Sequence, residues 1–188
     1  MKKIEISTFL EFQFVSNPTF SPNGKYIAFI VSTADKADNN YKGNIHVYDM
    51  EAKKVVKLTS GGDAKSYAWT PENTLVFPAN RSAETKKKAA AGEDITAINE
   101  ISPNGGEAVE IFTIPAKASG IKTLPNGNYL VSIKQDNHKD TRKKSYEVFD
   151  ELPFWGNALG YTNAIRNRLA ICDKTTGELT YIVCDWTD

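Results

Sequence analysis

Alternating apolar and polar positions recur along the chain in short runs, each introduced by a turn that contains proline. The three clearest runs are SPNGKYIAFIVS from Ser21, TPENTLVFPAN from Thr70 and LPNGNYLVSIKQ from Leu124. Proline presets φ at the second position of such a turn, and glycine accepts the positive φ that other residues resist. A short strand-like fragment precedes each run. Each unit therefore predicts a β-hairpin.

A second pattern follows each of these hairpins. It consists of a strand, a polar turn and another strand, as in NIHVYDMEAKKVVKLT from Asn44, AINEISPNGGEAVEIFT from Ala97 and RLAICDKTTGELTYIV from Arg168. Two consecutive hairpins make a four-stranded antiparallel unit, and its spacing of about 50 residues suits a propeller blade. We predict an all-β fold: one partial β-propeller, residues 1–188, with about three four-stranded antiparallel blades near 14–60, 64–114 and 118–188.

The faces of these strands favour blades over a two-sheet sandwich. Ile27, Phe29 and Val31 alternate with Ala28 and Ile30, so both faces of this strand are largely apolar. A strand with a neighbouring blade on each side needs two apolar faces, whereas a sandwich leaves one face polar. An antiparallel sandwich with accidental spacing is the alternative.

Three connecting segments break the strict repetition. Residues 34–42 are polar and are expected to form a solvated loop. Residues 81–93 contain three consecutive lysines without interleaved aromatic residues, so we interpret them as a mobile hairpin tip rather than a nucleic-acid patch. Residues 136–167 form a long insertion that begins charged and then becomes strongly apolar. Loops of this length in compact domains are usually functional or buried against another body.

Charge and composition narrow the classes of partner. The chain has 23 Lys and Arg residues against 23 Asp and Glu residues, so no net field attracts nucleic acid or an anionic membrane. No apolar run approaches the roughly 20 residues of a membrane-spanning helix. Glu5 and Glu11 interrupt the apolar segment that a signal peptide needs. Cys172 and Cys184 are too few for a disulfide framework or a zinc site, and we expect two thiols in a reducing compartment. These features predict a cytoplasmic protein.

Catalytic motifs are missing from the sequence. The two histidines, His46 and His138, fall on a strand of the first unit and in a charged loop, and no serine stands in a G-x-S-x-G frame. Neither a phosphate-binding G-x-x-x-x-G-K-[ST] loop nor an H-E-x-x-H metal motif occurs. We therefore expect no catalytic residue, no metal and no cofactor in this chain.

The order of several segments resembles a known family. NPTFSPNGKYIAFIVS, NIHVYDMEAKKVVKLTSG, AWTPENTLVF, INEISPNGGEAVEIFT and finally FDELPFWGNALGYT with RNRLAICDKTTGE follow one another as in prolyl oligopeptidase family serine peptidases. The resemblance is to their N-terminal propeller, most closely in the acylaminoacyl peptidase and dipeptidyl peptidase-like branch. It covers nearly the whole chain from about Asn17.

The resemblance implies a non-catalytic role beside an enzyme. Such a propeller precedes an α/β-hydrolase domain that carries the Ser, Asp and His triad, and it screens that active site from large folded proteins. None of the triad maps onto this sequence, so the implied partners are a C-terminal hydrolase domain and a peptide substrate. With about three blades the ring is open, and its exposed edge strands predict self-association or marginal stability.

The resemblance also points to one candidate binding segment within the long insertion. Glu147, Asp150 and Glu151 are candidates to bind the free α-amino group of a peptide by charge-assisted hydrogen bonds. Phe154 and Trp155 would form an apolar or cation-π wall beside it. Alternatively, the two aromatic side chains pack between blades or against the hydrolase domain, and the carboxylates are solvated.

Two further functional hypotheses stay open at this point. The chain could be a protein-interaction propeller with no associated peptidase, or a short enzyme or periplasmic sensor. The last is disfavoured because the sequence shows neither a signal peptide nor a His and Ser framework. A C-terminal extension containing G-x-S-x-G would separate the peptidase hypothesis from the interaction module.

Overall fold

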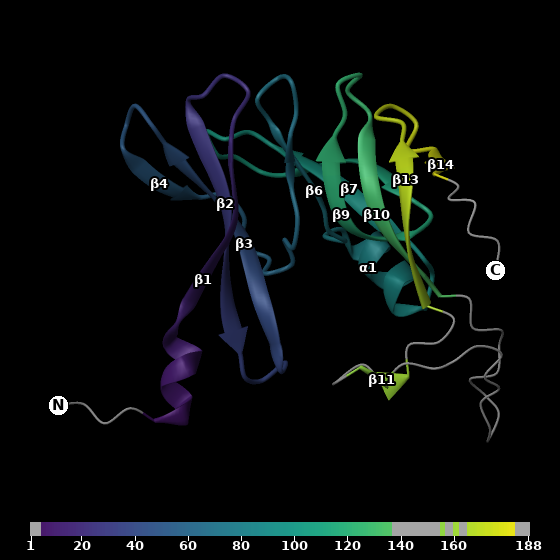
Figure 1. Ribbon diagram of the computed structural model, residues 1–188, viewed down its shortest axis with the longest axis horizontal. Helices are drawn as coiled ribbons and strands as arrows, with labels where there is room; N and C mark the ends of the chain where they lie inside the picture. Colours follow the sequence, from purple (N-terminus) through teal and green to yellow (C-terminus); the bar gives the residue numbers. More distant parts are fainter. Residues whose placement is uncertain (1–4, 137–154, 157–159, 162–164, 183–188) are drawn as a thin grey trace.

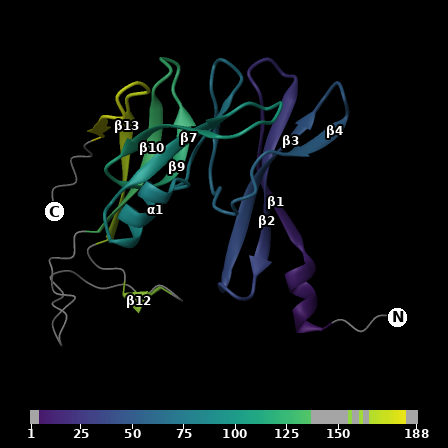
Figure 2. The same cartoon turned by 180° about the vertical axis from the view of Figure 1, so that it is seen from behind.

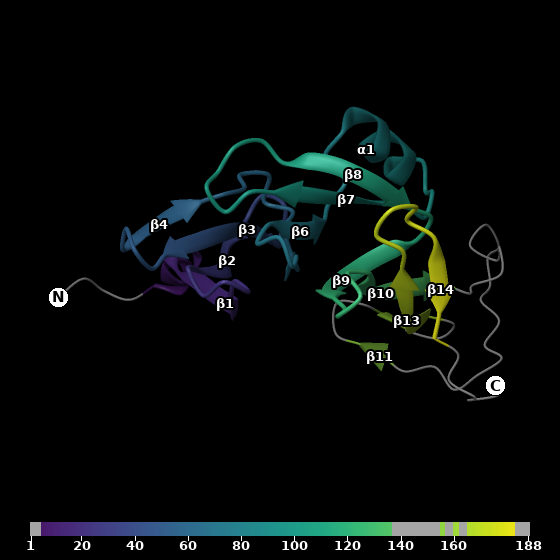
Figure 3. The same cartoon turned by 90° about the horizontal axis from the view of Figure 1, so that it is seen from above.

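Three four-stranded antiparallel sheets make up the computed structural model, which describes residues 5–136, 155–156, 160–161 and 165–182. The sheets stand side by side (Figure 1) and, seen from above, follow an open arc (Figure 3). The first strand of a sheet lies on the concave side of this arc and the last strand on the convex side. This arrangement confirms the predicted all-β fold, a segment of a β-propeller with three blades.

Each blade is a simple meander in which consecutive strands pair. The first has the order β1-β2-β3-β4, the second β5-β6-β7-β8 and the third β9-β10-β13-β14. The first blade comprises β1 (Gln13–Phe20), β2 (Tyr26–Asp35), β3 (Asn40–Asp49) and β4 (Lys54–Lys57), preceded by the 3₁₀ helix η1 (Ile6–Glu11). The second comprises β5 (Ala68–Trp69), β6 (Leu75–Pro78), β7 (Thr96–Ile101) and β8 (Val109–Ile114). The third comprises β9 (Lys117–Thr123), β10 (Tyr129–Asp136), β13 (Ile165–Cys172) and β14 (Leu179–Tyr181), with the small pair β11 (Trp155–Gly156) and β12 (Gly160–Tyr161) between β10 and β13.

The proline-containing turns close the first hairpin of each blade as predicted. Gly24, Asn73 and Gly127 occupy equivalent places and adopt φ values of 70°, 65° and 85°. Their N–H groups bond back to the carbonyl three residues earlier, at 2.9, 3.0 and 2.9 Å. Glycine and asparagine tolerate this left-handed conformation best, so the turn chemistry of the sequence dictates the backbone.

The first turn is one residue longer than the other two. The residues that pair across the turns are Phe20 with Ile27, Trp69 with Leu75, and Thr123 with Tyr129. Side chains alternate between the two faces of a strand. With one extra turn residue, a side chain at a given distance after the proline therefore lies on one face in the first blade and on the opposite face in the other two. Ala28 and Ile30 therefore face the second blade, whereas Ile27 and Phe29 face away from it.

Two apolar clusters join the three blades. The first lies between the first and second blades, and the second lies between the second and third. The first cluster includes Ala28, Ile30, Ile45, Val47, Leu75 and Phe77, and the second includes Val76, Ile98, Ile121, Tyr129, Val131 and Cys172. Adjacent residues of β6 belong to different clusters, so this strand is buried on both sides.

Tyr67 fastens the first blade to the second. Its hydroxyl lies 2.5 Å from the Asn17 carbonyl oxygen and 2.6 Å from that of Ala28, and 2.9 Å from the Thr19 hydroxyl. Asn17 has a φ of 53° and marks the bulge at which the β1–β2 pairing shifts. Burial raises the pKa of Tyr67, so the hydroxyl keeps its proton and can donate to one of these carbonyl groups.

Two connecting segments differ from the predictions. Residues 34–42 are largely exposed, as expected, but only 36–39 form the connecting turn, since β2 and β3 pair from Asp35 and Asn40 onward and the hairpin reaches beyond the strands of the second blade (Figures 1 and 2). Strand pairing extends this far because it satisfies backbone groups that a loop would leave to water.

The lysine-rich segment at 81–93 connects the antiparallel neighbours β6 and β7, as predicted for a hairpin end, but it contains the helix α1 (Ala83–Ala90) instead of a plain loop. The Ser82 hydroxyl oxygen caps this helix by accepting from the Thr85 N–H at 3.2 Å. Lys88 pairs with Glu84 one turn earlier at 2.6 Å. Within the described ranges, no helix has the length and apolar character needed to cross a membrane.

Candidate functional site

Most of the predicted peptide-binding segment lies outside the described residues. This applies to Glu147, Asp150, Glu151 and Phe154. Trp155 is described: it lies in β11, pairs with Tyr161 of β12 and is 67% exposed. The structure thus places the indole at the surface and leaves the predicted grouping of carboxylates and aromatic side chains untested.

A hollow of about 260 Å³ lies between the second blade, the start of the third blade and the segment that links the first two blades. Its walls come from the segment between the first two blades, the end of β6, the end of α1 and the beginning of β9. The polar residues among them are Asp63, Lys65, Asn80, Glu93, Thr96, Lys117 and Ser119. The volume lies just below the ~300 Å³ that small-molecule pockets usually reach.

Local hydrogen bonds hold the walls of this hollow in place. The Asn80 side chain donates to the Ile95 carbonyl at 3.0 Å and accepts from the Ala97 N–H at 2.8 Å. The Thr96 hydroxyl donates to the Ala116 carbonyl at 2.7 Å and accepts from the Ala118 N–H at 3.0 Å. The Thr96 bonds tie β7 to the start of β9, and the Asn80 bonds hold the segment after β6 against the start of β7.

Charges of both signs line the hollow. Lys117 forms an ion pair with Asp94 at 2.8 Å, with both side chains about half exposed. Asp63 Oδ1 is buried and has no hydrogen-bond partner. This carboxylate follows Gly61 and Gly62. The two glycines indicate a turn at this point, and they are the feature of the sequence that could have drawn attention to Asp63.

The hollow lacks the groups needed for nucleophilic hydrolysis. The Ser119 hydroxyl donates to the Ser132 carbonyl at 3.3 Å rather than to a base. His46, the one histidine in the described part of the chain, lies on the first blade, where its ring stacks on Phe29 at 5.8 Å. Its Nδ1 atom lies 3.1 Å from the Asn44 carbonyl oxygen. Among the described residues, the hollow thus does not bring a serine together with a histidine base.

The described cysteine is a structural one. Cys172 is buried between the second and third blades, and burial raises the pKa of its thiol to about 11. A protonated, inaccessible thiol is a poor nucleophile and a poor metal ligand. Cys184 lies outside the described residues. Across the described ranges, no group of His, Cys, Asp and Glu side chains is arranged to hold a metal ion.

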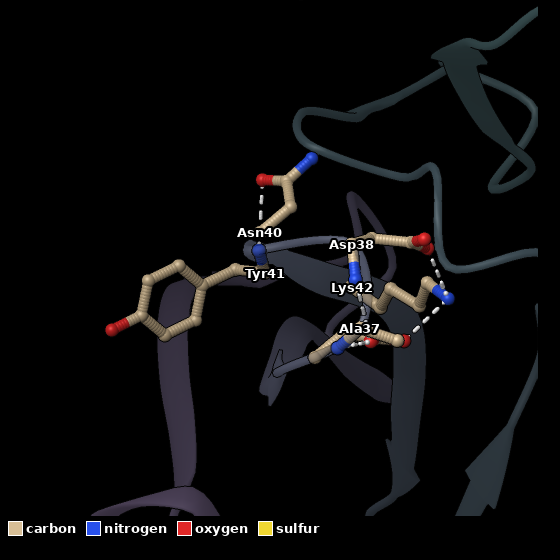
Figure 4. A network of polar contacts seen from close by, with 6 residues as sticks. Ala37, Asp38, Asn40, Tyr41 and Lys42 are labelled. Carbon is tan, nitrogen blue, oxygen red and sulfur yellow. Dashed lines mark hydrogen bonds and ion pairs between the residues drawn. The ribbon is translucent and has the colours of Figure 1, made fainter. Parts of the chain in front are cut away.

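The tip of the β2–β3 hairpin carries a small polar network (Figure 4). Lys42 bridges Asp35 at 2.5 Å and Asp38 at 2.8 Å. The Asp35 carboxylate also accepts from the N–H groups of Ala37 and Asp38. The Lys42 ammonium lowers the pKa of Asp35, and the two carboxylates raise the pKa of Lys42. The network closes the turn and pairs the Lys42 ammonium with two carboxylates.

Comparison with known proteins identifies relatives of this architecture. No family model matches the chain. A curated relative is the uncharacterized peptidase YuxL of Bacillus subtilis (strain 168), 24% identical over 176 residues, which is 88% of this chain and 25% of the relative.

Among solved structures, the acylaminoacyl peptidase of Pyrococcus horikoshii matches with a TM-score of 0.66 and 15% identity, over 94% of this chain and 26% of that one. A luciferin-regenerating enzyme matches with a TM-score of 0.51 and 11% identity, over 96% of this chain and 48% of that one.

These matches agree with the order of segments in the sequence. The chain spans about a quarter of the length of both peptidases. The structural matches establish the fold, and the curated relative adds a named peptidase whose similarity extends over most of the chain. The recognition made from the sequence is therefore confirmed: the chain is similar to the N-terminal propeller region of prolyl oligopeptidase family serine peptidases.

Proposed function

We propose that this chain is the non-catalytic propeller part of a cytoplasmic serine peptidase of the acylaminoacyl or dipeptidyl peptidase type. In this proposal the propeller gates an α/β-hydrolase domain of the parent protein and helps to position its peptide substrates. The observation that carries the proposal is the similarity to a curated peptidase across 88% of the chain.

The arrangement of the blades supports a gating role. The first strands of the blades line the concave side of the arc, which is the side that would face a central channel in a longer propeller (Figure 3). The described chain offers no nucleophile and base of its own, so the chemistry falls to the hydrolase domain. A channel of this kind admits extended peptides and excludes folded proteins by size.

Positioning of the substrate is assigned to the segment that ends at Trp155. Its carboxylates Glu147, Asp150 and Glu151 would bind the α-amino group of the peptide, and Phe154 with Trp155 would cover the first side chain. Trp155 is 67% exposed, which supports a contact of its indole with a ligand or with the hydrolase domain. Packing against that domain without any substrate contact is the competing role for the same residues.

The test uses the full product of the reading frame that contains this chain. We expect the full product to hydrolyse acylaminoacyl or aminoacyl p-nitroanilides and to react with a fluorophosphonate probe, and the 188-residue chain to do neither. An absence of any hydrolase sequence, labelling and cleavage would overturn the proposal.

Substitution of the segment tests the positioning role in the active protein. Glu151→Gln should raise KM for substrates with a free α-amino group and leave acylated substrates unchanged. The matched control is Glu107→Gln, which removes an exposed carboxylate from the second blade. Equal effects on both classes of substrate would contradict substrate positioning and favour the packing role.

A protein-interaction propeller without a peptidase is the second candidate. The match to a luciferin-regenerating enzyme shows that the same fold also occurs in a protein that is not named as a peptidase. Because one fold serves many functions, the fold alone does not choose between them. A full product without hydrolase activity would favour this candidate.

A further inference from the structure

The tripeptide Pro-Asn-Gly occurs three times in the sequence, at 22–24, 103–105 and 125–127. An asparagine that precedes glycine can undergo a reaction with its own backbone. The glycine nitrogen loses its proton and attacks the side-chain carbonyl carbon Cγ, a succinimide ring closes and ammonia leaves. Water then opens the ring and yields aspartate or isoaspartate. The rate in a folded protein depends on how firmly the turn holds the two reacting groups.

The first and last copies lie in tight turns that hold the asparagine side chain. Asn23 Oδ1 accepts from the Ser21 hydroxyl at 2.8 Å and from the Lys25 N–H at 3.0 Å. Asn126 Oδ1 accepts from the Asn128 N–H at 3.1 Å. In both turns the N–H of the following glycine bonds back across the turn at 2.9 Å. Reaction at either asparagine must therefore break several bonds of the turn first.

Other parts of the chain hold the same two turns from outside. The Asn23 N–H donates to the side-chain oxygen of Asn73 at 2.9 Å, which joins the first turn to the second blade. Gly127 is buried, and the Lys174 side chain lies so close that a Cβ atom at Gly127 would approach Nζ to 3.0 Å. These contacts further restrict the movement that ring closure requires.

The middle copy lies in a longer and more open connection. β7 and β8 are joined by residues 102–108, a longer segment than those that hold the other two copies. Gly105 and Gly106 have φ values of 97° and 108°, and a Cβ atom added to either would meet no heavy atom within 4 Å. Two consecutive glycines give the backbone after Asn104 wide conformational freedom. The Gly105 N–H can therefore leave its 3.1 Å bond to the Ser102 carbonyl more easily than its counterparts leave theirs.

The Asn104 side chain is held by the first blade. The Tyr26 hydroxyl donates to Asn104 Oδ1 at 2.8 Å. Attack on Cγ places negative charge on Oδ1, and a hydroxyl donor at this oxygen stabilises that charge. Ser21 donates to Asn23 Oδ1 in the same way, but there the glycine N–H stays in a tight turn.

We propose that Asn104 is a site of succinimide formation and deamidation in the folded protein, and that the Tyr26 hydroxyl assists the reaction. The products alter the junction of the first two blades. Aspartate adds a negative charge beside Tyr26, whereas isoaspartate lengthens the backbone by one carbon and displaces the oxygen that Tyr26 contacts. The proposal does not rest on peptidase activity.

Peptide mapping by mass spectrometry of the full product of the reading frame tests the proposal. The protein is warmed at mildly alkaline pH, which favours loss of the amide proton. We expect the peptide with Asn104 to gain the mass of an amide-to-carboxyl exchange several-fold faster than the peptides with Asn23 and Asn126. After denaturation in guanidinium chloride, the three should react at similar rates. No mass gain at Asn104 in the folded protein, or an equally fast gain at Asn23 or Asn126, would overturn the proposal.

Two variants test the assignment and the part played by the hydroxyl. Asn104→Gln should abolish the mass gain, because the longer side chain closes a ring far more slowly. Tyr26→Phe should slow the reaction at Asn104 and leave Asn126 unchanged. The matched control is Tyr48→Phe, which removes a tyrosine hydroxyl from β3 of the same blade. Circular dichroism checks that each variant is folded. An unchanged or faster reaction in folded Tyr26→Phe would overturn the role of the hydroxyl.

Discussion

The second blade and the first blade have similar sequences but different surroundings. All four residues of β6 are buried, because one blade packs on each face of this strand. In β2, Ala28 and Ile30 are buried and their neighbours on the other face are half-buried. An apolar side chain therefore contributes to stability according to whether its blade has a neighbour on that side, and not according to its place in the repeat.

The largest difference in stability is expected when a charge is placed on one or the other face of β2. Ala28→Glu puts an unpaired carboxylate against the second blade, where Ala28 has no exposed surface, and should cost more than about 4 kcal/mol or prevent folding. Ile27→Glu, one residue earlier, should cost much less because its side chain faces outward. Urea unfolding followed by circular dichroism measures both. A larger loss of stability in Ile27→Glu than in Ala28→Glu would show that the one-residue offset of the first turn is wrong.

Removal of a large side chain gives the next largest difference. Phe77→Ala leaves a cavity between two blades and should lower the free energy of unfolding by about 3–5 kcal/mol. Phe20→Ala removes a side chain of the same type that is 64% exposed, and should cost less than about 1 kcal/mol in the monomer. The comparison is made at a protein concentration where the chain is monomeric. Equal losses would mean that the Phe20 side chain is as well covered in solution as that of Phe77.

Loss of the Tyr67 hydroxyl should have an intermediate effect. Tyr67→Phe keeps the ring but leaves buried carbonyl oxygens of the first blade without this donor, at a cost of about 1–3 kcal/mol. The control is Tyr181→Phe, because Tyr181 is 42% exposed at the edge of the third blade. Hydrogen exchange should show faster opening of β1 in Tyr67→Phe. Unchanged exchange there would contradict the fastening role of the hydroxyl.

The smallest effect is expected at the exposed hairpin tip, beyond the cover of the second blade. Lys42→Met removes the ion pairs with Asp35 and Asp38 and should lower stability by less than Tyr67→Phe, because water screens exposed pairs. The Lys42 ammonium lowers the pKa of Asp35. The ion pair therefore contributes to the free energy of unfolding at a pH above the ordinary pKa of aspartate. This contribution is lost as the pH falls through the lowered pKa of Asp35.

Urea midpoints at neutral and acidic pH test this sign. The difference between wild type and Lys42→Met should be present at neutral pH and vanish in acid. Lys36→Met, in the same turn, serves as the control for simple charge removal. A difference in urea midpoint between wild type and Lys42→Met that grew in acid would contradict a stabilising ion pair between Lys42 and Asp35.

The sequence predicted the architecture because its signals are local. Proline-containing turns and alternating strands identify hairpins, and three repeats of two hairpins identify blades. The extra residue of the first turn was not predictable, because the motif SPNG looks the same whether the strand begins at Tyr26 or one residue later. The register appears only when Phe20 is seen to pair with Ile27.

The remaining differences have other physical causes. Helix α1 was missed although its alanines, lysines and Glu84 are good helix formers behind a Ser82 cap, because a plain loop was assumed between the two strands of the hairpin. The hollow could not be predicted, since segments far apart in sequence contribute its walls. The blade boundaries at 14–60, 64–114 and 118–188 and the substrate contacts of residues 147–155 stay predictions.

The longer first turn also affects the order in which the chain assembles. Both faces of β2 are apolar, so a strand displaced by one residue against β1 would not bury a polar side chain and would compete with the native pairing. The contacts that favour the native alignment include those of Tyr67 with Asn17 and Ala28. Tyr67 lies on the second blade's side of the junction, so we expect the final register of the first hairpin to become fixed only when this part of the second blade packs against it.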